Sequence, residues 1–274
     1  MDDRPSDTEA GPAKPQPEHA RAGAARAGRA GMADFGFAEV RAEEKAGLVG
    51  GIFSRVARRY DLMNDLMSGG LHRLWKDSLV DQLRPRDGLD FVDVAGGTGD
   101  IAFRIRRRAP EARITVSDIN PEMLSVGRDR ATNRGITDGI AWVTADAERL
   151  PFPDGAADAV TIAFGLRNVT NRDRALAEMQ RILRPGGRFL CMEFSRVAVP
   201  LLGQLYDRYS FKVVPWIGQI VTRDRDAYRY LVESIRRFPA QEDLAALMRT
   251  AGFERVSFRN LSGGIVAIHS GWRI

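Results

Sequence analysis

The sequence has few of the residues that form disulfides and metal sites. Its 274 residues include one cysteine, Cys191, and three histidines. A single cysteine excludes an internal disulfide and any multi-cysteine metal site, so we expect no metal and a reducing compartment. No stretch approaches the ~18 uncharged apolar residues of a membrane-spanning helix, and no internal repeat is visible. The class that remains is a soluble, compactly folded protein.

Composition and charge are those of an ordinary globular protein, with 44% hydrophobic and 28% charged residues. The length fits one domain of roughly 200–250 residues with an additional segment. Lysine and arginine number 41 against 36 aspartates and glutamates, a net charge of +5. This mild excess is compatible with an anionic partner or membrane surface without requiring one. No basic stripe is interleaved with stacking aromatics, so we do not expect nucleic-acid binding.

The first 33 residues differ from the rest of the chain. They contain nine alanines, four prolines and four glycines, and their only large apolar side chains are Met1 and Met32. Such a segment cannot bury enough surface to offset the entropy of ordering it, which predicts a disordered tail over 1–33. The tail lacks the apolar run of a secretory signal, and its acidic residues are atypical of a transit peptide. We therefore expect a cytoplasmic protein rather than one of the mitochondrial matrix.

From residue 34 on, strand-like apolar runs alternate with amphipathic stretches of helical length. The expected strands are Leu89–Val94, Ala112–Ser117, Ile140–Val143, Asp158–Phe164 and Gly187–Phe194, and the expected helices are Ile101–Ala109, Pro121–Thr132 and Arg172–Leu183. This alternation indicates βαβ units and a parallel sheet covered on both faces. Arg255–Arg259 and Ile265–Ser270 predict a C-terminal β-hairpin. The whole resembles the class I S-adenosylmethionine-dependent methyltransferase fold, an α/β Rossmann-like doubly wound sheet with a C-terminal antiparallel hairpin, formed here by one domain over 34–274.

A glycine-rich turn follows the first expected strand. Gly97, Gly99 and Ala102 fit the loose pattern G-x-G-x-x-A, in which glycines let the backbone approach a nucleotide. The following helix offers its N-terminal N–H groups to the ligand. Asp118 ends the second strand, 19 residues after Gly99, where a carboxylate can accept both ribose hydroxyls. At this point a nicotinamide cofactor and S-adenosylmethionine both remain open.

Two later features favour S-adenosylmethionine. Asp146 follows the third strand, where an acidic residue is well placed to bind an adenine amino group. The segment Leu183–Gly187 then stops a helix, turns and restarts a strand. Asp93 precedes the glycine turn, where it could cap or orient the loop or bind the cationic methionine end of the cofactor.

Several segments resemble one family, the ubiquinone/menaquinone biosynthesis C-methyltransferases. The segments are Tyr60–Ser68 with His72–Lys76, Phe164–Thr170, Arg181–Phe189 with Glu193–Ser195, and Tyr228–Ile235. The resemblance runs from about Phe35 to Ile274. Generic methyltransferases share the glycine loop but not the Tyr60–Trp75 stretch or the pair Arg167 and Asn168, so the match is specific to this family.

The resemblance implies methyl transfer from S-adenosylmethionine to a ring carbon of a polyprenylated quinol, in ubiquinone or menaquinone biosynthesis. Carried over residue by residue, family cofactor contacts fall on Thr98, Asp118, Asp146 and Ala147. A further family contact, often serine, falls here on Ala163, which leaves only a backbone contact at that position. The complete expected cofactor site comprises Tyr60, Asp93, Gly97, Thr98, Gly99, Asp118, Ile119, Asp146, Ala147 and Ala163.

Methylation of carbon requires an activated ring. A quinol hydroxyl with a pKa near ~10 is about 0.1% ionised at pH 7, and lowering that pKa to 7 takes roughly 4 kcal/mol of phenolate stabilisation. Arg167 is a permanent cation that could supply much of it, while Asn168 could orient a water or the substrate oxygen. His72 is the best titrating candidate for a base. The alternatives are a surface ion pair for Arg167 and a structural role for His72.

Two segments outside the sheet are expected to complete the site. An N-terminal helical lid over 38–84 would exclude water from the reactive sulfonium. An insertion over 197–238 contains the uncharged run Val213–Val221, which would cap the core or form a channel for the prenyl tail at a membrane interface. Nearby arginines, among them Arg229 and Arg237, would meet anionic headgroups or pair with acidic neighbours.

Two other functions remain open from sequence. One is methyl transfer to another hydrophobic phenolic or sterol acceptor, and the other is a methyltransferase-like scaffold of a quinone-synthesis complex. The sequence is compatible with such a complex, with peripheral contact at the inner membrane and with a homo-oligomer. It does not distinguish a benzoquinol from a naphthoquinol substrate.

Overall fold

The computed structural model describes residues 31–57, 60–197 and 225–274. The chain divides into two compact units, Met1–Met32 and Ala33–Ile274. Most of the predicted tail and residues 198–224 of the predicted cap, including Val213–Val221, lie outside the described residues. The second unit, together with the strand that begins at Met32, contains the elements described below.

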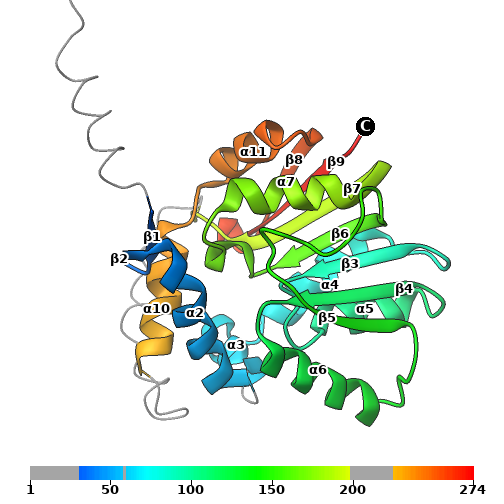
Figure 1. The fold of residues 1–274 in the computed structure, drawn as a ribbon, viewed down its shortest axis with the longest axis horizontal. Coiled ribbons are helices and arrows are strands. Elements are labelled where there is room, and N and C mark those ends of the chain that lie inside the picture. The colour runs from blue at the N-terminus through cyan, green and yellow to red at the C-terminus, as the bar shows by residue number, and fades with distance from the viewer. Residues whose placement is uncertain (1–30, 58–59, 198–224) are drawn as a thin grey trace, which may run out of the picture. The chain divides into compact units, whose positions relative to one another are not determined.

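A seven-stranded sheet forms the centre of this unit (Figure 1). Its strands lie in the order β5 (Ile140–Thr144), β4 (Arg113–Asp118), β3 (Asp90–Val94), β6 (Ala157–Ala163), β7 (Leu183–Phe194), β9 (Val266–Trp272) and β8 (Glu254–Leu261). The first five are parallel, whereas β9 runs antiparallel to both β7 and β8. This confirms the predicted parallel sheet with a C-terminal antiparallel hairpin. Strand β7 begins earlier than predicted, because Leu183 pairs with Ala157 ahead of an irregularity that precedes Arg188.

The order of the strands creates a switch point beside β3. The chain proceeds outward from β3 to β4 and β5, and then returns to place β6 on the other side of β3. In open parallel sheets of this kind, ligands bind in the crevice at the carboxyl ends of the strands where the order reverses. The carboxyl ends of β3, β4 and β6 are therefore where a site is expected.

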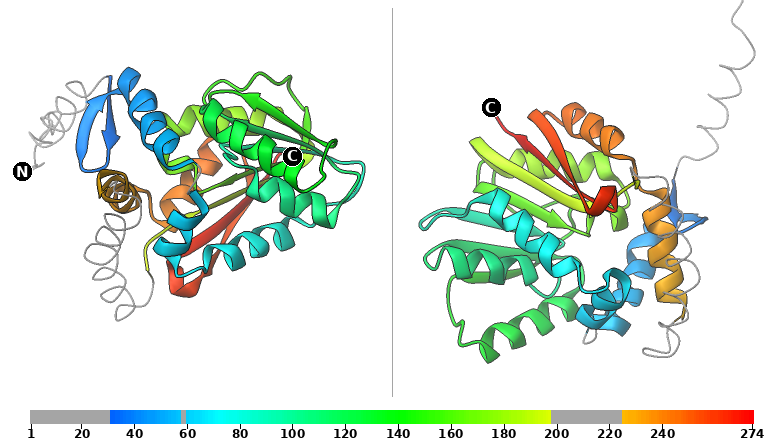
Figure 2. Two further views of the ribbon diagram at one scale, coloured as in Figure 1. Left: turned by 90° about the horizontal axis from the view of Figure 1, so that it is seen from below. Right: turned by 180° about the vertical axis from the view of Figure 1, so that it is seen from behind.

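Helices cover both faces of the sheet (Figure 2). One core contains buried residues of α4 (His72–Leu83), α5 (Asp100–Arg108) and α6 (Pro121–Asn133), and the other contains those of α7 (Arg172–Ile182) and α11 (Gln241–Thr250). Along β3, Phe91 belongs to the first core, whereas Val92 and Val94 belong to the second. Successive side chains of a strand point to opposite faces, so β3 is covered on both sides. Asn120 caps α6 as its sequence suggested, accepting the N–H groups of Glu122 and Met123.

A further group of elements lies beside the carboxyl ends of the strands. It comprises β1 (Met32–Phe35), β2 (Ala38–Arg41), α2 (Ala42–Val56), α3 (Tyr60–Ser68) and α10 (Arg225–Arg237), with β1 and β2 forming a small separate sheet (Figures 1 and 2). The Tyr230 ring stacks on Phe35 with centroids 4.6 Å apart, and Glu233 accepts the Phe37 N–H. The predicted lid segment 38–84 thus contains β2, α2, α3 and α4, whereas the β1–β2 pair was not predicted.

Candidate active site

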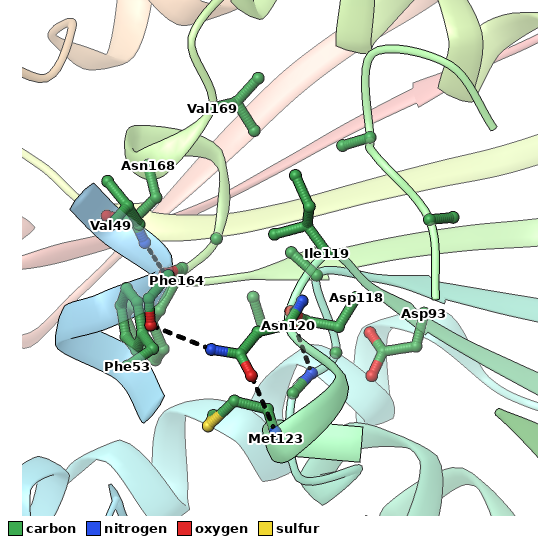
Figure 3. A pocket seen from close by; sticks show the side chains of 18 of the residues that line it. Val49, Phe53, Asp93, Asp118, Ile119, Asn120, Met123, Phe164, Asn168 and Val169 are labelled. Carbon is green, nitrogen blue, oxygen red and sulfur yellow. Dashed lines mark hydrogen bonds between the residues drawn. The ribbon is translucent and has the colours of Figure 1, made fainter. Parts of the chain in front are cut away.

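A cavity opens at the carboxyl ends of β3, β4, β5 and β6, and one side of α2 closes it (Figure 3). Its empty space is about 1080 Å³, a volume that includes the open mouth. The strand ends contribute residues between positions 93 and 170, and α2 contributes Ala46, Val49, Gly50 and Phe53. The cavity lies at the switch point of the sheet, where the fold places ligands.

The glycine turn between β3 and α5 needs glycine for two different reasons. Gly97 lines the cavity with a φ of +55°, a backbone conformation that side chains disfavour. Gly99 has a φ of +78° and precedes α5, and a Cβ there would lie 2.5 Å from the Trp142 ring. Of the two predicted glycines, Gly97 faces the cavity, while Gly99 lets the first turn of α5 pack on β5.

The Asp118 carboxylate anchors this turn to the end of β4. Its Oδ2 accepts the Gly97 N–H and its Oδ1 accepts the Asn120 N–H, each at 2.9 Å. Burial raises the pKa of Asp118 to about 6, although these N–H donors act in the opposite direction. A carboxylate has about four acceptor positions, so Asp118 keeps acceptor capacity for a hydroxyl donor. This geometry suits the predicted ribose contact.

Asp93, next to the carboxyl end of β3, also lines the cavity and exposes none of its surface. Its Oδ1 accepts the Thr161 hydroxyl at 2.7 Å, while its Oδ2 has no hydrogen-bond partner among the described residues. A Cβ at Gly96 would come within 2.6 Å of that Oδ2. Burial raises the pKa of Asp93 to about 7, with the Thr161 hydroxyl acting against it. A buried oxygen without a donor is costly unless a ligand supplies one, which suits the predicted cationic contact.

The other predicted cofactor residues on these strand ends have different surroundings. Those lining the cavity are Thr98, Ile119, Asp146, Ala147 and Ala163. Ile119 exposes 45% of its surface, which makes an apolar face available to a planar ring. Asp146 accepts the Glu148 N–H at 2.9 Å through Oδ1. The Thr98 hydroxyl accepts from Arg130 at 2.9 Å, so its side chain already has a partner within the protein.

Two residues without glycine's freedom adopt left-handed backbone conformations at the cavity. Ala95 follows β3 with a φ of +50°, and Phe164 follows β6 with a φ of +59°. Both line the cavity, and a Cβ at Gly165 would come within 2.7 Å of the Ala95 Cβ. Strained conformations of this kind cost of order 1–3 kcal/mol and cluster at functional sites. The two loops therefore meet in a closely fitted wall.

Arg167 does not line the cavity, and the catalytic role that the sequence suggested for it stays a prediction. Its side chain is 3% exposed and pairs at 2.9 Å with Glu193, which is 1% exposed. The same Nη1 donates to the Phe164 carbonyl at 2.6 Å, and Glu193 also accepts the Arg167 backbone N–H. Because the charge of Glu193 offsets that of Arg167, the guanidinium is not a free cation for a phenolate. The alternative considered for Arg167 was an ion pair at the surface, and the structure has the ion pair but places it in the interior.

Asn168, the neighbour of Arg167, does line the cavity (Figure 3). It lies in a short 3₁₀ turn, Leu166–Asn168, with its Nδ2 3.5 Å from the Phe164 carbonyl. Its Oδ1 accepts the Tyr230 hydroxyl from α10 at 3.2 Å. Of the Arg167–Asn168 pair, the structure thus brings the amide to the cavity and places the guanidinium behind it.

His72 is likewise separate from the cavity. Its Nε2 lies 2.8 Å from Asp65 Oδ1, its Nδ1 is buried without a partner among the described residues, and its side chain is 4% exposed. Burial lowers the pKa of His72, and the nearby Lys76 acts in the same direction. This placement favours the structural alternative over a base. Tyr60 begins α3, but its side chain lies outside the described residues.

Sequence reasoning assigned no role to three charged residues near the cavity. Lys76 and Asp100 both line it and pair at 2.7 Å, and Lys76 is 4% exposed. The sequence did indicate that these two residues are near a site, because Lys76 ends the HRLWK segment and Asp100 directly follows the glycine turn. Lys45, 2% exposed on α2, donates to the Val169 carbonyl at 3.0 Å. Burial lowers the pKa of Lys45 to about 8, with Arg172 acting likewise, and the polar context AEEKAG gave no sign of burial.

The described ranges 31–57, 60–197 and 225–274 have neither a membrane-spanning helix nor a metal-binding cluster. No helix described there is both long and apolar enough to cross a bilayer. Those ranges also contain no group of three or more histidine, cysteine, aspartate or glutamate side chains arranged to hold a metal ion. On α10, Arg229 pairs with Glu233 at 2.7 Å and Arg237 pairs with Asp34, which favours the ion-pair alternative for these two arginines.

Comparison with known proteins gives consistent matches. The model of the "ubiE/COQ5 methyltransferase family" matches residues 39–273. The chain is 60% identical over 240 residues to the "Ubiquinone/menaquinone biosynthesis C-methyltransferase UbiE" of Paracoccus denitrificans, covering 88% of this chain and 96% of that protein. It is 56% identical over 243 residues to the protein of that name from Brucella abortus, covering 88% and 90%. A solved S-adenosylmethionine-dependent methyltransferase of Thermotoga maritima matches with a TM-score of 0.59 and 22% identity, covering 82% of this chain and all of that one, which confirms the fold.

Proposed function

The chain belongs to the ubiE/COQ5 methyltransferase family, and we propose that it uses S-adenosylmethionine to methylate a ring carbon of a polyprenylated quinol in ubiquinone or menaquinone biosynthesis. The names of the relatives at 60% and 56% identity support the reaction and the substrate class. The observation that carries the proposal structurally is Asp118, which holds the glycine turn through one oxygen and the start of α6 through the other, and which lines the cavity.

The lining residues fit the proposed cofactor. Asp118 would accept the ribose hydroxyls, Ile119 would cover the adenine ring, and Asp146 with Ala147 would bind its edge. Asp93 has an unpaired oxygen suited to the ammonium of the methionine part. Bound there, S-adenosylmethionine supplies an electrophilic methyl group. Gly97 contributes a backbone that can approach the ligand closely, because it has no Cβ.

The substrate side of the cavity is formed by α2 and the loop after β6. Val49, Phe53 and Phe164 give it an apolar wall, which would exclude water from the reacting atoms. Asn168 would hold the substrate oxygen or the water that receives its proton, since its amide is a polar side chain that this loop brings to the cavity. Arg167 would act as a positioning residue, because it holds the Phe164 carbonyl and, through Glu193, the turn that carries Asn168.

The remaining segments have supporting roles in this proposal. The helices of the 38–84 segment would form the lid. Helix α2 is tied to the start of α6 by the Asn120 Nδ2, which donates to the Gly50 carbonyl at 3.1 Å and to the Ser54 hydroxyl at 2.9 Å. The 197–238 segment would receive the prenyl tail. Because such a tail resides in lipid, we also propose peripheral contact with the inner membrane, which sedimentation with anionic vesicles tests.

The function is tested by methyl transfer from labelled S-adenosylmethionine to demethylated benzoquinol and naphthoquinol acceptors. We expect labelled quinol from the wild type, and at least about a tenfold lower rate in Asn168→Ala with unchanged cofactor affinity, as for loss of one oriented hydrogen bond. The control is Asn133→Ala, at the exposed end of α6, which should behave as wild type. Cofactor binding without label on either ring would contradict the substrate class, and an unaffected Asn168→Ala would remove that residue from the site.

A further inference from the structure

Acidic side chains outnumber basic ones among the described residues that line the cavity. Among the described lining residues, the carboxylates are Asp93, Asp100, Asp118, Asp146 and Glu148. The one cation among those described lining residues is Lys76, on α4. An acidic cavity suits a ligand with a sulfonium and an ammonium, because opposite charges attract strongly where water is scarce. The same ligand also carries a carboxylate, for which the acidic groups offer nothing.

Lys76 is held in a fixed position at the start of α5. Its Nζ donates to Asp100 Oδ2 at 2.7 Å, and Asp100 Oδ1 accepts from Arg104 one turn further along α5. Burial raises the pKa of Asp100, but Lys76 and Arg104 outweigh burial and hold it at about 2. An ammonium has three donors, and Asp100 is the single acceptor of Lys76 within the described ranges. Two donors of a buried cation at the cavity wall therefore have no protein partner there.

A complementary acceptor lies in the same cavity. The Oδ2 of Asp93 is buried without a hydrogen-bond partner among the described residues. Lys76 is close enough for its charge to act on the Asp93 carboxyl, where it opposes the larger effect of burial. One end of the cavity thus offers both an unused cationic donor and an unused anionic acceptor. This is the pairing that an α-amino acid group, with its carboxylate and ammonium on one carbon, requires.

We propose that the Lys76 ammonium binds the methionine carboxylate of the cofactor while Asp93 receives its ammonium. The inference rests on the proposed use of S-adenosylmethionine and assigns Lys76 a role in recognising its amino-acid end. The competing explanation is purely structural, with Lys76 serving only to join α4 to α5 through Asp100. The two explanations differ in one measurable respect: only carboxylate binding makes Lys76 sensitive to whether the ligand has a carboxylate.

The experiment compares two ligands that differ at that group. Calorimetry would measure the dissociation constants of S-adenosylmethionine and of decarboxylated S-adenosylmethionine for wild type and for Lys76→Gln, which keeps a donor for Asp100 but removes the charge. The ratio that matters is the dissociation constant of decarboxylated S-adenosylmethionine divided by that of S-adenosylmethionine. We expect this ratio to fall at least about tenfold in Lys76→Gln, which is the lower range for loss of a hydrogen bond to a charged group. Lys76→Arg should retain most of the wild-type ratio.

The matched control is Arg104→Gln, which removes the other cation from Asp100 but lies outside the cavity wall. It should leave the ratio unchanged, because it weakens the α4–α5 junction without touching the ligand. A ratio that stays within twofold of wild type in Lys76→Gln would overturn the inference, as would a wild type that binds both ligands equally. The comparison of the two ligands in the wild type can overturn the inference even if the Lys76→Gln variant does not fold. Failure of the wild type to bind S-adenosylmethionine at all would instead overturn the proposed function.

Discussion

The two sides of the cavity use charged residues in opposite ways. On the glycine-turn side, Asp93 and Asp118 line the cavity, and burial raises the pKa of each. On the side formed by the loop after β6, the charges of Arg167 and Glu193 pair with each other behind the wall. The first side is arranged to receive a ligand's polar groups, whereas the second uses its charges to fix a backbone that presents Asn168, Phe164 and apolar surface. In the proposed function, the charges on the first side bind the ligand, whereas those on the second side fix the backbone.

The largest effect that tests this contrast is on stability. Arg167→Met should lower the free energy of unfolding by about 3–5 kcal/mol, because it leaves Glu193 as an uncompensated buried charge. Urea denaturation measures this, with Arg107→Met as the control, since that arginine is exposed and pairs at 3.3 Å with Asp77. The double variant Arg167→Met with Glu193→Met should recover much of the loss. Undiminished stability together with abolished methyl transfer would place Arg167 back in direct contact with substrate.

The next effect is on cofactor binding. Asp118→Ala removes the acceptor for the ribose hydroxyls and also releases the Gly97 and Asn120 N–H groups. Loss of hydrogen bonds to a charged group costs about 1.5–3 kcal/mol, so the dissociation constant of S-adenosylmethionine should rise about 100-fold. Calorimetry checks this against Asp138→Asn, an exposed carboxylate paired with Arg106. Affinities within threefold of wild type would show that the glycine-turn side does not receive the ligand.

A smaller effect follows from the raised pKa of Asp93. Burial raises it to about 7, so the folded protein without ligand binds a proton that the unfolded chain releases near pH 4. Its stability should therefore fall as pH rises from about 4 to about 7. A cationic ligand favours the ionised form, so affinity for S-adenosylmethionine should rise about tenfold from pH 6 to pH 8, accompanied by proton release. In Asp93→Asn both dependences should flatten, and a wild-type affinity independent of pH would contradict a contact with Asp93.

The same contrast explains what could be predicted from sequence. Gly97, Asp118 and Asp146 follow strands whose ends the fold brings together, so their backbone positions alone take them to the cavity. Arg167 and His72 were judged by residue type, but their directions depend on Glu193, 26 residues away along the chain, and on Asp65. Lys45 was unremarked because burial of a lysine in a polar helix depends on what packs over it. The sequence pattern predicts which residues lie at strand ends, whereas the partners that a long side chain meets in the folded chain decide where it points.

The smallest expected effect concerns His72. Since its pKa is lowered by burial, the ring is neutral near pH 7, and donation from Nε2 to Asp65 leaves Nδ1 as the basic atom. That atom is buried and the residue does not line the cavity, so a substrate proton has no access to it. His72→Gln preserves the donor to Asp65, and its kcat for methyl transfer should remain within about threefold of wild type with an unchanged pH profile. A drop of more than tenfold together with loss of the acid limb of that profile would restore His72 as the base and would extend the ligand-facing charges beyond the glycine-turn side.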